Sequence, residues 1–143
     1  MKFNSSTIIG VCLLACISGI ICSACKPVRQ FDQLEQNARK VVTGAELQAW
    51  AVNLLAQHTP SNTRLNPSQF GADFPKALLD LAPDIGPSVY VYEKDDKNYP
   101  VACVHINWGS GMLGAAGFEV GPTNFVSLQP SHAWQPGVYF YRR

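Results

Sequence analysis

The fold of this chain is decided by residues 88–108, SVYVYEKDDKNYPVACVHINW. Residues 88–92 alternate Val and Tyr, and residues 99–108 are rich in β-branched and aromatic side chains. Because the charged run at residues 93–98 separates these two segments, the pattern predicts an antiparallel hairpin with a charged tip. The hairpin indicates a β-sheet in the C-terminal half of the chain.

Three more strands are expected after the hairpin. They cover residues 118–120, 125–128 and 137–141, where apolar and aromatic side chains lie between segments rich in Gly and Pro. Cys103 stands within the apolar part of the hairpin and is expected to be a small buried residue.

Two helices are expected before the hairpin. Apolar side chains recur at helical spacing over residues 31–42. A second helix begins after Thr43, because Thr43 and Glu46 form the capping-box pattern. It ends at His58, just before a Thr-Pro pair.

The segment between these helices and the hairpin is expected to contain little regular structure. Residues 60–73 are predicted to be a long loop that covers part of the core or a site, and residues 73–82 a short helix with Pro75 in its first turn. Helices followed by strands imply an α+β fold. We expect N-terminal helices packed on a small antiparallel β-sheet that the C-terminal half forms.

The beginning of the chain has the order of a secretory leader. Lys2 precedes an uncharged apolar run over residues 8–21, and the small residues 23–24 precede Cys25. This layout resembles a bacterial lipoprotein signal peptide. The resemblance covers the leader alone, and it implies cleavage before Cys25 and lipidation of that cysteine.

Other fates of the leader stay open. Residues 8–24 number 17, at the lower limit of about 17 to 25 for a spanning helix, so a single-pass anchor is an alternative, as is free secretion. Cys16 is a rival processing site, but cleavage there would leave the apolar run 17–21 on the mature chain.

Cys22 and Cys25 form a C-x-x-C without a second ligand pair, so no redox or metal site is predicted there.

The chain therefore divides into a leader (1–24), a tether (25–30) and a single α+β domain (31–143). It carries 11 basic and 10 acidic side chains, and removal of Lys2 with the leader leaves 10 of each. This balance lacks the basic excess of a nucleic-acid-binding protein, so no nucleic-acid partner is predicted.

Residues 109–114, GSGMLG, match the pattern G-x-G-x-x-G. A dinucleotide site would need a helix immediately afterwards, but a glycine-rich segment follows instead, so no dinucleotide cofactor is predicted. Gly109 and Gly111 are still candidates for a nest of backbone amides that binds an anion. The alternative is a tight, irregular hairpin.

His105 and His132 are the candidate general bases near neutral pH. Alternation places His105 and Asn107 on the less apolar side of their strand, so we expect them to face solvent or a groove. Together with Glu119, the two histidines are a candidate acid–base or metal cluster. Their spacing matches no metal motif, so no metal is predicted and surface histidines are the simpler interpretation.

Trp108, Trp134, Tyr139 and Tyr141 lie near the glycine segment or in the last strand. Exposed Trp and Tyr side chains are the usual centres of binding surfaces, whereas core packing explains most aromatic residues in a small domain. Both interpretations stay open from the sequence.

The leading hypothesis is a non-catalytic module of the cell envelope, outside the cytoplasm and attached to a membrane through its N-terminus. It would bind an envelope protein, a peptide or a glycan. The candidate ligand-binding residues are His105, Trp108, Gly109, Gly111, His132 and Trp134. The sequence contains no catalytic motif, but a small hydrolase or transferase with a histidine base is an alternative, as is a purely structural envelope protein.

Overall fold

A computed structural model of the chain shows how these segments fold. The structure describes residues 31, 33–58, 62, 64–94, 99–109, 114–128 and 131–143. The leader, the tether, the C-x-x-C and the lipidation candidate Cys25 lie outside the described residues.

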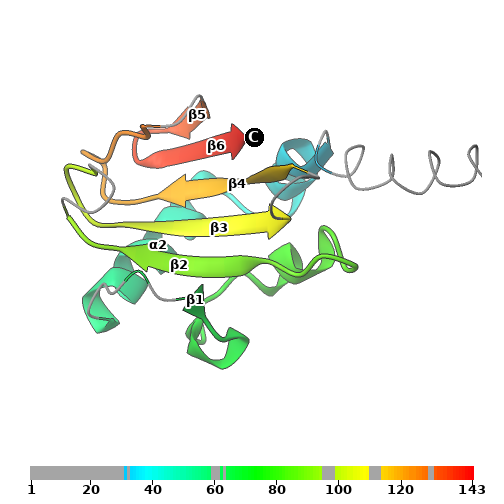
Figure 1. Ribbon diagram of the computed structural model, residues 1–143, viewed down its shortest axis with the longest axis horizontal. Helices are drawn as coiled ribbons and strands as arrows, with labels where there is room; N and C mark the ends of the chain where they lie inside the picture. Colours follow the sequence, from blue (N-terminus) through cyan, green and yellow to red (C-terminus); the bar gives the residue numbers. More distant parts are fainter. Residues whose placement is uncertain are drawn as a thin grey trace, which may run out of the picture.

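Helical segments and one antiparallel sheet build the domain, so the α+β class is confirmed (Figure 1). Helical residues 33–41 come first. The labelled elements are α2 (Gly44–Gln57), β1 (Arg64–Leu65), η1 (Pro67–Gln69), η2 (Lys76–Asp80), β2 (Ser88–Tyr92), β3 (Cys103–Gly109), β4 (Ala115–Val120), β5 (Ser131–Gln135) and β6 (Val138–Arg142). The six strands follow the order β1-β2-β3-β4-β6-β5.

The expected division of the chain into N-terminal helices and a C-terminal sheet needs a correction. The helical segments occupy residues 33–57, well inside the chain. The sheet also takes a strand from before the C-terminal half, because β1 pairs with β2 through Arg64 and Tyr90.

The predicted hairpin is confirmed by the pairing of β2 with β3, which runs from Ser88 opposite Asn107 to Tyr92 opposite Cys103. The strand predicted at residues 125–128 is wrong, because β5 begins only at Ser131. Phe125 instead closes a turn, in which its N–H donates to the Pro122 carbonyl at 2.8 Å, and its ring is fully buried.

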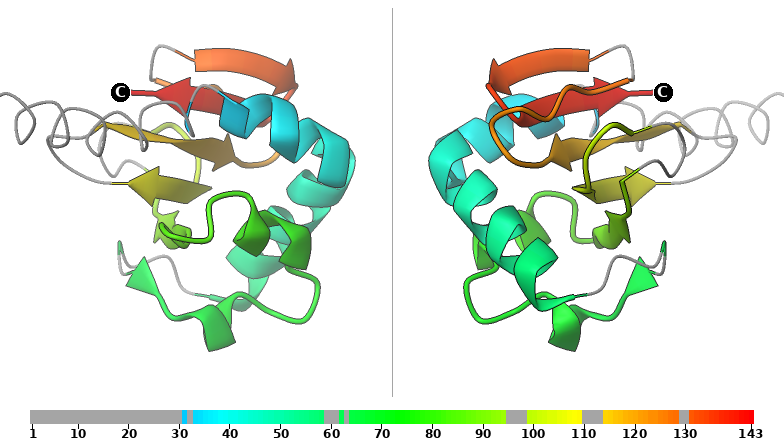
Figure 2. Two further views of the ribbon diagram at one scale, coloured as in Figure 1. Left: turned by 90° about the vertical axis from the view of Figure 1, so that its right-hand side faces the viewer. Right: turned by 90° about the vertical axis from the view of Figure 1, so that its left-hand side faces the viewer.

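The helices cover one face of the sheet (Figure 2). The alternation predicted for β3 is confirmed, since Val104, Ile106 and Trp108 join the core beneath the helices. Cys103 is fully buried, as expected, and packs in a separate cluster with Tyr92, Tyr99 and Phe125. The opposite face of the sheet therefore has an aromatic core of its own.

The start of α2 follows the predicted capping box. The Glu46 N–H donates to Thr43 Oγ1 at 3.2 Å, and the Thr43 N–H donates to Glu46 Oε2 at 2.8 Å. The bonds from the Thr43 backbone and hydroxyl lower the pKa of the Glu46 carboxyl. The side of α2 that carries Leu47, Trp50 and Leu54 is buried against the sheet.

The long segment before the hairpin does cover the core. The Trp50 indole donates to the Phe70 carbonyl at 2.7 Å, and the Trp50 and Phe74 rings meet edge to face with centroids 5.1 Å apart. Part of the segment is β1 and η1 rather than loop. None of the described helices combines the length and the hydropathy that crossing a bilayer requires.

Candidate functional site

Four polar side chains meet on the sheet face opposite the helices. We call them the Glu119 cluster: Glu119 on β4, His105 on β3, and Tyr99 and Ser127 from the flanking loops. His105 Nε2 lies 2.8 Å from Glu119 Oε1, and the Tyr99 hydroxyl donates to the same oxygen at 2.7 Å. The Ser127 hydroxyl donates to Glu119 Oε2.

The register of the sheet positions this pair, because His105 stands directly opposite Glu119 in the pairing of β3 with β4. Cross-strand neighbours lie close enough for their side chains to interact. Two acceptor atoms 2.8 Å apart would repel, so we place the hydrogen of the imidazole on Nε2, which donates to Glu119.

Glu119 is fully buried and has a lowered pKa. Burial by itself raises the pKa of this carboxyl. The hydrogen bond and charge of His105, together with the bonds from Ser127 and Tyr99, lower the pKa by more than burial raises it. The carboxyl is therefore ionised, with its charge shared among three donors.

Aromatic rings enclose His105, so it does not face open solvent or a groove as expected. The residue is 7% exposed, and its ring meets that of Tyr92 edge to face with centroids 4.7 Å apart. The rings of Tyr99 and Tyr141 lie within 5.7 Å and 5.6 Å of it, centroid to centroid. The pair therefore presents little surface to a substrate.

The structure does not place His132 with His105 and Glu119. His132 lies on the sheet-edge strand β5 with a side chain that is 80% exposed, and its Nδ1 is 3.3 Å from Glu35 on the first helical segment. Among the described residues, no three His, Cys, Asp or Glu side chains are arranged to hold a metal ion.

The four aromatic candidates do not form one platform. Trp108 is fully buried in the core beneath the helices, and its Nε1 has no hydrogen-bond partner among the described residues. Trp134 packs at the margin of the same core, with the Arg39 guanidinium 4.6 Å from its ring centroid. Tyr139 and Tyr141 lie on the opposite face of the sheet, where Tyr141 bonds with Asn107.

Gly109 ends β3 with a φ of +81°, a conformation that favours glycine. A Cβ at this position would lie 2.6 Å from Cζ of Phe31, so the close approach of the Phe31 ring also requires glycine. Gly111 lies outside the described residues, and with it the middle of the proposed amide nest.

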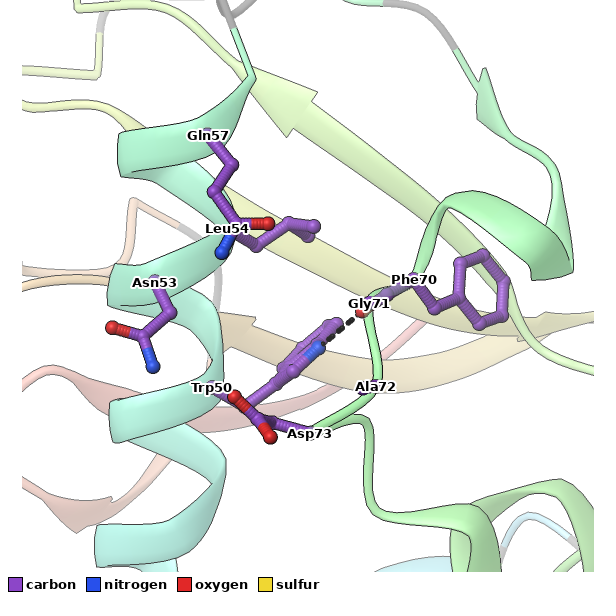
Figure 3. Close-up of a pocket in the computed structure, with 8 residues that line it drawn as sticks. All are labelled: Trp50, Asn53, Leu54, Gln57, Phe70, Gly71, Ala72 and Asp73. Atoms are coloured by element: carbon purple, nitrogen blue, oxygen red, sulfur yellow. Dashed lines mark hydrogen bonds between the residues drawn. The ribbon is translucent and has the colours of Figure 1, made fainter.

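A pocket that no sequence motif indicated lies between α2 and residues 70–73 (Figure 3). Its volume is about 220 Å³. Polar side chains on its walls are Asn53 and Gln57 from one side of α2 and Asp73 from the facing segment. The prediction that residues 60–73 cover part of the core or a site was the one signal for it in the sequence.

A second pocket, of about 310 Å³, shares the lining residue Asp73 with the first. It lies between the beginning of α2 and the start of η2, where Glu46 and Lys76 line it. We call the two pockets together the α2 groove. With two carboxylates and one ammonium group among these side chains, the groove has a negative charge at neutral pH.

Comparison of the chain with protein-family models, with curated proteins and with solved structures finds no match in any of the three.

Proposed function

We propose that this chain is a binding module of the cell envelope, lipid-anchored at Cys25, which holds a peptide in the α2 groove. The single observation that carries the proposal is the pocket that Asn53 and Gln57 of α2 line together with Asp73 of the segment 70–73. Concave sites with an apolar floor and a few convergent polar groups are the usual places of ligand binding.

The pocket favours a peptide over a glycan. Sugar rings bind by stacking on exposed aromatic faces, but the Trp50 and Phe70 rings in this pocket are each only 3% exposed. The amides of Asn53 and Gln57 stand one helical turn apart and offer both donors and acceptors to a peptide main chain. A volume of about 220 Å³ accommodates one side chain of such a peptide rather than a whole cofactor.

The charge of the groove favours a basic side chain in that peptide. Asp73 lines both pockets, and Glu46 adds a second carboxylate. The pKa of Glu46 is lowered by its bonds from Thr43, so this carboxylate is ionised at neutral pH. A lysine or arginine side chain placed at Asp73 would pair with it and leave the apolar floor to the stem of the side chain.

Calorimetric titration of the full-length protein in detergent tests this function. The lysine peptide Ala-Ala-Lys-Ala is expected to bind and the glutamate peptide Ala-Ala-Glu-Ala is not. Asp73→Asn is expected to weaken lysine-peptide binding by about tenfold, the worth of a charge-assisted hydrogen bond. Asp84→Asn changes an exposed carboxylate outside both pockets and serves as the matched control.

Equal binding of the two peptides, or equal losses in the two variants, would contradict the proposed site. A protein that binds neither peptide would leave the structural envelope protein as the better account of this chain.

The anchoring half of the proposal has its own test, the intact mass of the protein purified from its native membrane. A mass that begins at Cys25 and includes acyl groups is the expected result. Retention of residues 1–24 would favour the single-pass anchor, and a mature chain without lipid would favour secretion.

Acid–base catalysis by a small hydrolase or transferase is the second candidate, and it draws on the 2.8 Å contact between His105 and Glu119. In such a reaction His105 would take a proton while Glu119 stabilises the imidazolium. Turnover of ester or amide substrates that His105→Asn abolishes without unfolding the protein would favour this candidate. The low exposure of the ring favours a structural role for the pair.

A further inference from the structure

The beginning of the described domain and its last two arginines lie at the same end of the sheet. The contact of Phe31 with Gly109 places the beginning of the domain at the end of β3. The backbone of Arg143 pairs with that of Ala115, through N–H to carbonyl distances of 3.1 Å and 2.8 Å. A Cβ at Gly109 would also lie 2.8 Å from the Gly114 carbonyl oxygen, so these segments adjoin. We call this region the Gly109 end.

The Gly109 end carries positive charge. Arg142 and Arg143 are both exposed, and the Arg143 guanidinium lies 5.7 Å from the centroid of the Tyr141 ring. Glu35, on the first helical segment, is paired with an arginine one turn further on at 2.7 Å.

The proposed anchor lies close to this end. Phe31 follows Cys25 by six residues, and six residues span at most about 20 Å when fully extended. Strand β3 has seven residues, so its first residue, Cys103, lies ~20 Å from the Gly109 end. An anchor at Cys25 would therefore lie within about 20 Å of Phe31, at the Gly109 end of the sheet.

We infer that the Gly109 end is a membrane-contact surface, at which Arg142 and Arg143 bind the anionic headgroups of the bilayer that holds Cys25. This inference rests on the proposed anchoring. A lipid chain and a basic surface act together in membrane attachment, since the chain supplies apolar burial and the bases supply attraction to anionic lipids. The lipid holds the protein on the bilayer, and the arginines fix which side of the domain faces it.

Paramagnetic relaxation measured by NMR tests the orientation. The full-length protein, isotopically labelled and purified from membranes, is reconstituted in nanodiscs with a small share of gadolinium-chelating lipid. In discs rich in phosphatidylglycerol we expect the strongest broadening at the amides of Gly109, Ala115 and residues 141–143. The weakest is expected at residues 92–94, at the opposite end of the hairpin.

Two double variants separate the arginines from charge in general. Each base near an anionic surface strengthens binding about fivefold. Arg142→Ser combined with Arg143→Ser is therefore expected to lower the headgroup-bound population roughly 30-fold. Its broadening in phosphatidylglycerol discs should then match that of the unmodified protein in phosphatidylcholine discs. Arg64→Ser with Lys94→Ser removes two exposed bases away from the Gly109 end and should leave the pattern unchanged.

The outcomes distinguish this inference from the anchoring proposal. A protein whose intact mass shows no acyl group overturns both. An acylated protein with uniform broadening, or with the same broadening in both kinds of disc, overturns the contact surface alone. Equal effects of the two double variants would also overturn it, because charge anywhere on the domain would then suffice.

Discussion

Replacement of Glu119 by Gln is expected to destabilise the protein at neutral pH and to reduce its sensitivity to acid. Glu119 accepts hydrogen bonds from His105, Tyr99 and Ser127 with its two oxygens. Gln has one oxygen and an amide nitrogen in the same space, and the nitrogen would face a donor. At least one buried donor therefore loses its acceptor, and the charge opposite His105 disappears.

The size of the effect follows from these lost interactions. A buried donor without an acceptor costs about 1 to 3 kcal/mol, and more where the lost partner is charged. Since Gln keeps the shape and one acceptor, we expect about 3 kcal/mol. For a domain of this size that loss lowers the Tm by roughly 10 to 20 °C.

The pH dependence has a definite sign. The folded pKa of Glu119 is lowered, so the ionised carboxylate stabilises the fold above its unfolded pKa of about 4.3. This stabilisation is lost as the pH falls from there through the folded pKa. Glu119→Gln has no carboxyl to protonate at this position. The difference in the free energy of unfolding between the variant and the unmodified protein should therefore shrink as the pH falls.

Urea unfolding followed by tryptophan fluorescence, from about pH 3 to about pH 7, measures both effects. Glu46→Gln is the matched control, because Glu46 also has a lowered pKa but is exposed and should have a much smaller effect at neutral pH. Identical unfolding of Glu119→Gln and the unmodified protein at neutral pH would contradict the stabilising role of Glu119. A difference in stability that stays constant as the pH falls would contradict the role of its ionised form.

Three further substitutions and one control test the packing that positions the site. Thr43→Ala removes the hydroxyl that caps α2 and should cost about 1 kcal/mol in urea unfolding. Gly117→Ala would place a Cβ 1.9 Å from a backbone oxygen of β3, and should cost about 1 to 3 kcal/mol by thermal unfolding. Gly86→Ala, with nothing within 4 Å of the added Cβ, should leave the Tm nearly unchanged. Trp50→Phe removes the hydrogen bond to residues 70–73, which should cost about 1 kcal/mol and weaken lysine-peptide binding in the calorimetric titration.

The elements that the sequence predicted well depend on neighbours along the chain. The cap at Thr43 needs only the side chain three residues later, and the β2–β3 hairpin needs two alternating segments around one charged turn. The failed strand at residues 125–128 shows the limit of such patterns. The apolar residues of this segment do not all reach the core: the Phe125 ring is buried, but Val126 is 56% exposed and Leu128 is 51% exposed.

The strand that takes its place, β5, has a weaker pattern, since an edge strand with one neighbour carries polar and exposed residues. The two-residue strand β1 is shorter than any periodic pattern. Both strands form because a partner strand offers them backbone hydrogen bonds. The partner of β1 is β2, which is distant in the sequence, whereas the partner of β5 is β6, which follows directly after the turn at residues 136–137.

The candidate sites divide in the same way. Alternation along β3 determined that His105 lies on the opposite side of the strand from Ile106 and Trp108. The sequence did not show that His105 would be buried, because the rings that enclose it come from other parts of the chain. The groove at Asp73 was equally hidden, since α2 and the segment that follows it form its walls only when they pack together.

The sequence by itself determined the class of the fold, the cap of α2, the alternation of β3 and the balance of charge, all of which depend on composition or on residues a few positions apart. Tertiary structure alone decided that Glu119 faces His105, that His132 lies elsewhere, and that Arg142 and Arg143 lie at the end of the sheet where Phe31 begins the domain. The physical reason is that strand register and helix packing bring distant residues together, and no local pattern records which strand will be the neighbour.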